Sequence, residues 1–200
     1  MSHELRNPLN GILGYAQILQ RGKTASSKQQ DGLSIIYKCG CHLLTLINDV
    51  LDISKIEAKK LEFHSKEFHF DEFLLGVQEI CRIRAEQKEI GFSYQALNHL
   101  PPAIYAGEKR LRQVLINLLS NAIKFADTGG VNFKVGVVND SINKESKATI
   151  YKISFQVGDT GIGMTPEQME KIFLPFEQVG DSSRKTEGTG LGLAICCTIV

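Results

Sequence analysis

The first twenty residues carry two parallel stripes of different character. The apolar stripe repeats at alternating intervals of four and three, through Leu5, Leu9, Ile12, Ala16 and Leu19. This heptad spacing predicts a helix with a narrow apolar seam that faces another helix. The polar or small stripe beside it consists of His3, Asn7, Asn10, Gly14 and Gln17. His3 and Asn7 would therefore lie one turn apart next to the seam, with Glu4 beside them.

A second segment, residues 33–54, predicts a longer helix of the same kind. Its apolar or small positions are again three and four residues apart, at Leu33, Ile36, Gly40, Leu43, Ile47, Val50 and Ser54. The polar residues 21–30 are expected to connect the two helices as a loop. Two antiparallel helices cannot bury this much apolar surface against each other, so we expect a second copy of the chain to complete a four-helix bundle. A hairpin that packs on the rest of the same chain is the alternative.

From residue 61 the pattern changes to alternation with aromatic side chains, which predicts strands mixed with helices. The segment LEFHSKEFHF (61–70) resembles a strand, and Asp71 is expected to cap a helix that runs to about Gln87. Strands are expected at 90–94, 103–106, 131–138 and 149–157, the last two joined by the polar loop NDSINKESK, and a further helix at 110–125. This order predicts an α+β sandwich in which one sheet carries helices on one face. The domain boundary is expected between residues 60 and 66, which gives domains 1–62 and 63–200.

Composition and charge exclude several classes of function. The 23 basic and 22 acidic side chains leave a net charge of +1, which gives no reason to expect binding to nucleic acid or to a membrane surface. The five cysteines contain no C-x-x-C pair and fit neither a zinc site nor a disulfide framework, so reduced thiols in the cytoplasm are expected. No apolar run approaches the ~18 residues that a membrane span needs, and no secretory signal pattern precedes the first helix.

The expected helix 110–125 has a polar row that suggests chemistry. The row consists of Gln113, Asn117, Asn121 and Lys124, at intervals of four, four and three. Asparagine is a poor choice for a solvated helix face. Its carboxamide oxygen can bind a hard cation such as Mg²⁺, and a lysine one turn further along can contact phosphate oxygens. Asparagines that merely cap or bridge are the alternative.

The strand expected at 149–157 runs into the glycine-rich segment VGDTGIG. Asp159 would present a hydrogen-bond acceptor in a pocket, while Gly161 and Gly163 would let the backbone turn sharply and approach a flat ligand closely. An ordinary turn would use the same residue types, so this motif alone is weak.

A second glycine-rich segment, GTGLGLAI, leads into an apolar helix and begins with Gly188, Thr189, Gly190, Leu191 and Gly192. Free backbone N–H groups at such a helix start can bind an anion. Between the two segments, FLPF (173–176) and the polar residues after it are expected to form a lid over a bound nucleotide. For GTGLGLAI the alternative is a tight helix start that binds no anion. For FLPF and the residues after it the alternative is a plain surface loop.

In this order and spacing, the segments resemble the motifs of the sensor histidine kinases of two-component signalling. SHELRNPLNGILG resembles the phosphoacceptor box, RLRQVLINLLSNAIKF the asparagine box, DTGIGM the first glycine box, FLPFEQ the phenylalanine box and GTGLGLAI the second glycine box. The resemblance covers essentially the whole chain. It implies a helical hairpin that forms half of a dimeric four-helix bundle, followed by an α/β sandwich of the gyrase, heat-shock chaperone and histidine kinase type.

The resemblance also implies an ATP-dependent histidine kinase with His3 as the phosphoacceptor. Glu4 would orient or deprotonate the imidazole, and Asn7 would position water or phosphate. The phosphoryl group would then pass to an aspartate in the receiver domain of a response regulator. The implied partners are that receiver domain and a second copy of the chain, with no nucleic acid and no membrane segment in this chain.

The resemblance implies ATP and Mg²⁺ as cofactors. Asn121 would bind Mg²⁺, Asn117 and Lys124 would assist at the phosphates, and Asp159 would hold the adenine amino group. The pocket and its lid would be shaped by Gly161, Gly163, Gly188, Thr189, Gly190, Leu191 and Gly192.

Compared with this family, the chain is expected to be truncated at both ends. Only Met1 and Ser2 precede His3, and the chain stops at Val200, where the family continues with the rest of a helix and closing strands. A non-catalytic remnant that binds ATP or dimerises is therefore the main alternative. A relative that shares only the ATP-binding fold is a third possibility, against which the histidine box argues.

Overall fold

The computed structural model describes residues 2–21, 27–57, 64–142, 149–178 and 189–199. Its elements fall into two compact units. One is built on the helices α1 (Ser2–Arg21) and α2 (Ser27–Glu57), and the other begins at the strand β1 (Lys66–His69). Each unit is described by itself.

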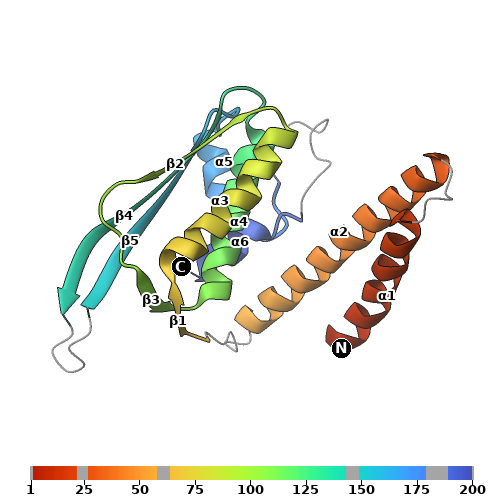
Figure 1. The fold of residues 1–200 in the computed structure, drawn as a ribbon, viewed down its shortest axis with the longest axis horizontal. Helices are drawn as coiled ribbons and strands as arrows, with labels where there is room; N and C mark the ends of the chain where they lie inside the picture. The colour runs from red at the N-terminus through yellow and green to blue at the C-terminus, as the bar shows by residue number, and fades with distance from the viewer. Residues whose placement is uncertain (1, 22–26, 58–63, 143–148, 179–188, 200) are drawn as a thin grey trace. The chain divides into compact units, whose positions relative to one another are not determined.

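The helices α1 and α2 lie side by side as a hairpin (Figure 1). The contact face of α1 contains the buried side chains of Leu9, Leu13 and Ala16. On α2 it contains Gly40, where a Cβ atom would lie only 2.6 Å from Cδ2 of Leu13. The absence of a side chain at Gly40 therefore allows the two helices to approach closely.

The seam expected on the first helix is divided in the structure. Leu9 and Ala16 are buried against α2, whereas Ile12 and Leu19 are 54% and 56% exposed. Further exposed apolar side chains on this unit are Tyr15, Ile18, Ile35, Ile36, Leu43 and Val50. The connecting loop was expected at residues 21–30, but residues 27–30 already belong to α2, so the predicted C-terminal end of the loop is wrong.

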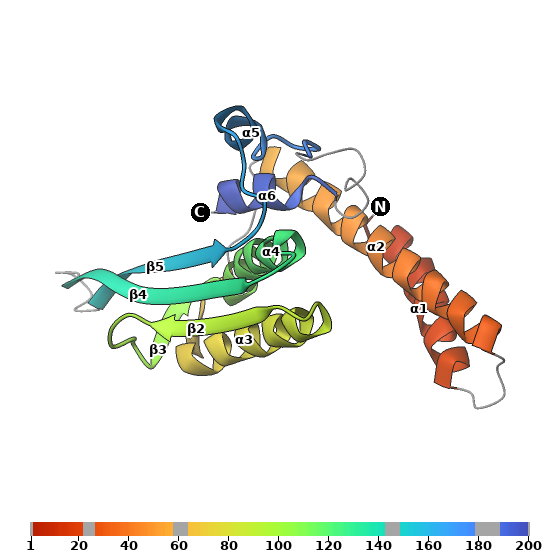
Figure 2. The same ribbon diagram turned by 90° about the horizontal axis from the view of Figure 1, so that it is seen from above.

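The second unit contains two sheets where the sequence predicted one. Strand β1 pairs antiparallel with β3 (Ala103–Ala106). In the other sheet, β4 (Gly130–Ile142) lies between β2 (Gly91–Ala96), with which it is parallel, and β5 (Thr149–Asp159), with which it is antiparallel. The helices α3 (Phe70–Gln87) and α4 (Glu108–Phe125) cover one face of this three-stranded sheet (Figures 1 and 2). Two shorter helices, α5 (Pro166–Lys171) and α6 (Gly192–Ile199), follow β5.

The hydrophobic core of this unit lies between the sheet and the two long helices. On β4, Val131, Phe133 and Val135 are buried, while Asn132 between them is exposed, as strand alternation requires. The largest buried side chains from the helices are Phe70, Leu74, Leu115 and Leu119. Each such side chain contributes about 1.5–3 kcal/mol on burial, so this core positions α4 firmly against β4.

Two expected element ends are wrong. Asp71 does not cap α3: the N-cap position belongs to His69, and Asp71 lies in the first turn, where a negative charge favours the helix dipole. Residues 139–142 belong to β4 and not to a loop, because the ladder with β5 resumes after an irregularity between Val137 and Asn139. The rest of that expected loop, 143–148, lies outside the described residues, as do 61–63 of the first expected strand.

Within the described residues, no helix combines the length and the apolar character needed to cross a membrane. The five cysteine thiols are free, and they differ in their surroundings. Cys81 on α3 is completely buried, and burial raises the pKa of its thiol from 9.0 to about 11.

The buried thiol of Cys81 predicts a loss of stability at high pH. In the unfolded chain this thiol ionises near pH 9, whereas in the folded chain it stays protonated until about pH 11. Its contribution to the free energy of unfolding is therefore fully present below pH 9 and is lost as the pH rises through 11, with a slope on the order of 1 kcal/mol per pH unit. Urea denaturation followed by circular dichroism between these pH values should show a shallower decline in Cys81→Ala than in the native chain. Cys39→Ala, which removes an exposed thiol, should keep the native decline; equal slopes for all three proteins would contradict the assignment.

Candidate functional site

The helix α4 presents the predicted polar row beside a buried apolar face. Val114, Leu115 and Ala122 are buried, whereas Asn117 and Asn121 are half-buried and one turn apart. The two asparagines therefore lie at the boundary of the core, where a side chain is held in place yet remains accessible to a ligand.

The side chain of Asn117 connects α4 to the first turn of α6. Its Nδ2 donates to the backbone oxygen of Gly192 at 3.3 Å and lies 3.7 Å from Sγ of Cys196. A Cβ atom on Gly192 would lie 3.3 Å from the same amide. The structure thus brings together two predicted site residues, Asn117 and Gly192. No sequence pattern indicated the third partner, Cys196, whose thiol pKa is raised by burial.

Asn121 has a different environment from Asn117. Among the described residues, none forms a hydrogen bond with its side chain, so its carboxamide oxygen is free to accept another partner. One turn further, Lys124 is half-buried and its Nζ lies 5.0 Å from the ring centroid of Phe125. A free amide oxygen followed by an ammonium group fits a magnesium ion and its phosphate ligands.

Asp159 ends β5, and its carboxylate is held by the next turn of the chain. Oδ1 accepts the backbone N–H of Gly161 at 2.8 Å. A Cβ atom on Gly161 would lie 2.6 Å from that oxygen and 2.8 Å from the carbonyl oxygen of Phe125. Gly161 therefore packs directly on the last turn of α4, and this contact joins the Asp159 loop to the helix that carries Asn121.

Two of the remaining predicted glycines have a left-handed backbone conformation. Gly163 and Gly190 have φ values of 67° and 68°, a region that glycine adopts without strain. Thr189 accepts the N–H of Leu191 through Oγ1 at 3.1 Å, and Leu191, which is fully buried, leads directly into α6 at Gly192. Gly188 lies outside the described residues.

The predicted histidine cluster lies in α1. His3, Glu4 and Asn7 all belong to this helix, so His3 and Asn7 are one turn apart as expected, and the helix continues through Pro8. These three residues belong to the helical unit, and the asparagine helix and Asp159 belong to the other.

Besides Cys196, two further residues near the site were not predicted. Lys88, just after α3, donates through Nζ to the carbonyl oxygens of Ile123 at 3.0 Å and of Lys124, and lies 3.6 Å from the carboxylate of Asp127. It therefore holds the C-terminal turn of α4, where cations are favourable. The other is Thr160, whose hydroxyl contacts the turn that precedes β4. Both contacts join segments that are thirty or more residues apart, so no local pattern could reveal them.

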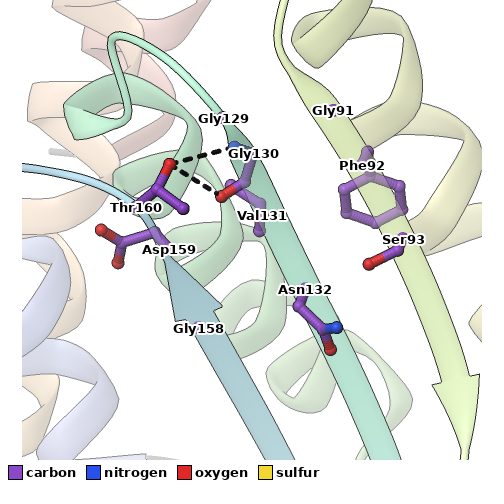
Figure 3. Close-up of a pocket in the computed structure, with 10 residues that line it drawn as sticks. All are labelled: Gly91, Phe92, Ser93, Gly129, Gly130, Val131, Asn132, Gly158, Asp159 and Thr160. Carbon is purple, nitrogen blue, oxygen red and sulfur yellow. Dashed lines mark hydrogen bonds between the residues drawn. The ribbon is translucent and has the colours of Figure 1, made fainter.

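A hollow of about 580 Å³ lies where β2 and β4 begin and β5 ends (Figure 3). Its lining is formed mostly by small residues, and Asp159 is the one predicted site residue among them. The Asp159 carboxylate points away from Ser93 and Asn132, which also line the hollow (Figure 3). Asn121 and Lys124, whose side chains fit a metal ion and phosphates, lie on α4, which does not line the hollow.

Two family models match the chain. The first, described as the His Kinase A (phospho-acceptor) domain, matches residues 1–59. The second, described as the histidine kinase-, DNA gyrase B-, and HSP90-like ATPase, matches residues 106–200. Every predicted site residue falls within one of these two ranges.

Several curated proteins are similar over nearly the whole chain. Hybrid signal transduction histidine kinase K of Dictyostelium discoideum is 37% identical over 205 residues, which cover 100% of this chain and 17% of that protein. The autoinducer 2 sensor kinase/phosphatase LuxQ of Vibrio vulnificus is 36% identical (100% and 23% covered), and the aerobic respiration control sensor protein ArcB of Escherichia coli is 34% identical (98% and 24%). The chain thus spans less than a quarter of the length of each of these relatives.

Two solved structures resemble the chain over nearly its whole length. Full-length ShkA in complex with AMPPNP matches with a TM-score of 0.73 and 35% identity, covering 99% of this chain and 39% of ShkA. The histidine kinase AdeS of Acinetobacter baumannii matches with a TM-score of 0.56 and 25% identity, covering 98% of this chain and 85% of AdeS.

Proposed function

Because this chain belongs to the histidine kinase family, we propose that it is an ATP-dependent protein-histidine kinase core of two-component signalling. His3 takes the γ-phosphoryl group of ATP and passes it to an aspartate in the receiver domain of a response regulator. The observation that carries this proposal is the contact of Gly161 with the carbonyl of Phe125. Through this contact the Asp159 loop lies against the helix that carries Asn121, whose amide forms no hydrogen bond with any residue that the structure describes.

In the proposed nucleotide site, each side chain has a role that follows from its chemistry. Asp159 accepts a hydrogen bond from the adenine amino group through the oxygen that Gly161 leaves free. Asn121 ligates Mg²⁺, and Lys124 contacts the phosphates as a point charge. When bound, the metal neutralises charge on the phosphate oxygens. Asn117 acts beside them by holding the first turn of α6, through its hydrogen bond to Gly192.

At the proposed phosphoacceptor, one ring nitrogen of neutral His3 attacks the γ-phosphorus of ATP. A nitrogen–phosphorus bond forms and the bond from the γ-phosphorus to the β,γ-bridging oxygen breaks, so that ADP leaves. Glu4 accepts the proton of the other ring nitrogen. The contact of its carboxylate with that nitrogen fixes the tautomer of the imidazole and stabilises the positive charge that develops on the ring during the attack. Asn7, one turn along α1, positions phosphate or water when the phosphohistidine reacts.

Residues 1–62, which include α1 and α2, would serve as the dimerisation and phosphoacceptor domain, and residues 63–200 as the ATP-binding domain. The exposed apolar side chains of α1 and α2, such as Ile12, Leu19 and Leu43, supply a surface for a second copy of the hairpin. ATP is a cytoplasmic cosubstrate, so the proposed reaction places both domains in the cytoplasm. A receiver domain would then bind where the phosphohistidine is accessible on the bundle.

The chemical stability of the phosphoryl label tests this proposal. The chain is incubated with γ-labelled ATP and Mg²⁺, and the label is then exposed to acid and to base. A phosphoramidate is lost in acid and kept in base, whereas a phosphoserine behaves in the opposite way. We expect an acid-labile, base-stable label that a metal chelator prevents from forming. An acid-stable label, or nucleotide binding with no label at all, would overturn the proposed activity.

A further inference from the structure

Thr160, between Asp159 and Gly161, is bound to the turn that leads from α4 into β4. Its Oγ1 accepts the backbone N–H of Gly130 at 3.0 Å and donates to the carbonyl oxygen of Thr128. Its own N–H donates to the carbonyl oxygen of Gly130 at 3.2 Å. Figure 3 shows the Thr160 side chain directed at Gly130 across the end of the sheet.

The turn is shaped to receive this side chain. Gly129 has a φ of 82°, and a Cβ atom there would lie 2.5 Å from Oγ1 of Thr160. At Gly130, a Cβ atom would lie 2.4 Å from the backbone oxygen of Gly91 on β2. The hydroxyl therefore lies against a turn in which neither Gly129 nor Gly130 has room for a side chain. Strand β2 lies against this turn at Gly130 and prevents the turn from moving away.

The residues after Thr160 have no comparable anchor. Ile162 and Met164 are 60% and 51% exposed, and within the described residues neither they nor Gly163 form a hydrogen bond to the rest of the domain. Gly161 bonds locally to Asp159. The orientation of the Asp159 carboxylate thus depends on two fixed points, the packing of Gly161 on Phe125 and the hydrogen bonds of Thr160.

We propose that Thr160 is a positioning residue for adenine recognition, which acts by fixing the backbone of Asp159. This inference rests on the proposed role of Asp159. Without the hydroxyl, the strand end can shift relative to the turn, and the carboxylate no longer meets the 6-amino group at hydrogen-bonding distance. The proposed contacts of Asn121 and Lys124 with Mg²⁺ and the phosphates come from α4 and are unaffected.

The test compares ATP with ITP, which has an oxygen in place of the 6-amino group. Dissociation constants are measured by calorimetry for the native chain, Thr160→Val and Thr160→Ser. Valine has the same shape without the hydroxyl, and serine keeps the hydroxyl. We expect Thr160→Val to bind ATP about five- to tenfold more weakly, which corresponds to the loss of one well-placed hydrogen bond, and to bind ITP as the native chain does. Thr160→Ser should restore the preference for ATP.

Two further variants separate a positioning role of Thr160 from a merely structural one. Thr45→Val removes a hydroxyl that donates to the Cys41 carbonyl at 3.0 Å within α2, and it should bind both nucleotides normally. Should Thr160→Val fail to fold by circular dichroism, Thr160→Cys, a weaker hydrogen-bonding group of similar size, takes its place with a smaller expected loss of preference. Equal weakening for ATP and ITP would overturn the inference, since it would reveal a merely structural role.

Asp159→Asn separates this inference from the proposed function. If Asp159→Asn binds ATP much more weakly while Thr160→Val binds it normally, the role of Thr160 is overturned and the role of Asp159 stands. If Asp159→Asn binds ATP like the native chain, both the adenine contact and the inference drawn from it are overturned.

Discussion

Replacing His3 with glutamine is expected to reduce phosphoryl labelling of the chain to background, at least a hundredfold below the native level. The change removes the only atom that the proposed reaction phosphorylates, because a carboxamide nitrogen is not a nucleophile near neutral pH. Glutamine forms helices at least as well as histidine, so α1 should persist. Binding of ATP, which the proposal assigns to the other domain, should stay within twofold of the native value.

His42→Gln is the matched control for this variant. His42 is an exposed residue of α2, and the substitution is chemically identical. It should label at the native rate, measured as label incorporated against time at saturating Mg·ATP. Labelling of His3→Gln at the native rate, or loss of label from both variants, would show that another residue accepts the phosphoryl group.

Replacing Gly161 with alanine is expected to weaken ATP binding at least thirtyfold. The added methyl group would lie 2.6 Å from the Asp159 carboxylate and 2.8 Å from the carbonyl oxygen of Phe125. The carboxylate could rotate away, but the carbonyl belongs to the backbone of α4 and cannot. The Asp159 loop must therefore move away from α4, at a cost of about 2–3 kcal/mol. This movement would disturb both the packing of Gly161 on Phe125 and the hydrogen bonds of Thr160, which together orient the Asp159 carboxylate.

Gly158→Ala is the control, three residues earlier in the chain. A Cβ atom at Gly158 would have no heavy atom within 4 Å. Alanine should therefore be accepted there, with ATP affinity within about twofold of native by calorimetry. If Gly161→Ala and Gly158→Ala bind ATP equally well, the Asp159 loop does not form the adenine end of the site.

The long periodic elements and the chemistry-bearing motifs could be predicted from the sequence. The helix α4 was expected from its apolar stripe, and Asn121 stood out because asparagine is a poor choice for a solvated helix face. Asp159 was singled out only by its place in a glycine-rich segment after a strand, a pattern that ordinary turns share. The element ends were less predictable. Asp71 suggested an N-cap, but burial of Phe70 decides where α3 begins, and this depends on the core that Phe70 enters.

Contacts between distant segments could not be predicted. Thr160 lies inside a motif noticed for its glycines, and its partner Gly130 is thirty residues away. Lys88 follows α3 in the chain, and only the tertiary fold brings its Nζ to the Ile123 carbonyl in the last turns of α4. The division of the strands into two sheets had the same cause, since the pairing of β1 with β3 joins residues that no local pattern relates.

The parallel pairing of β2 with β4 has a consequence for how the domain folds. Gly91 pairs with Gly130, so the chain between them, including all of α4, must be closed into one loop before the first rung of this ladder forms. Loop closure of this kind makes folding slow compared with that of a helical hairpin, whose contacts are more local. The antiparallel pairing of β4 with β5 joins neighbouring segments of the chain and does not need this closure. Thr160, beside Asp159, bonds to Gly130, the same residue that pairs with Gly91 on β2, so the adenine contact reaches its final surroundings only when the parallel ladder has formed. A domain without this ladder would therefore bind ATP weakly, and nucleotide affinity reports on the closure of the loop between Gly91 and Gly130.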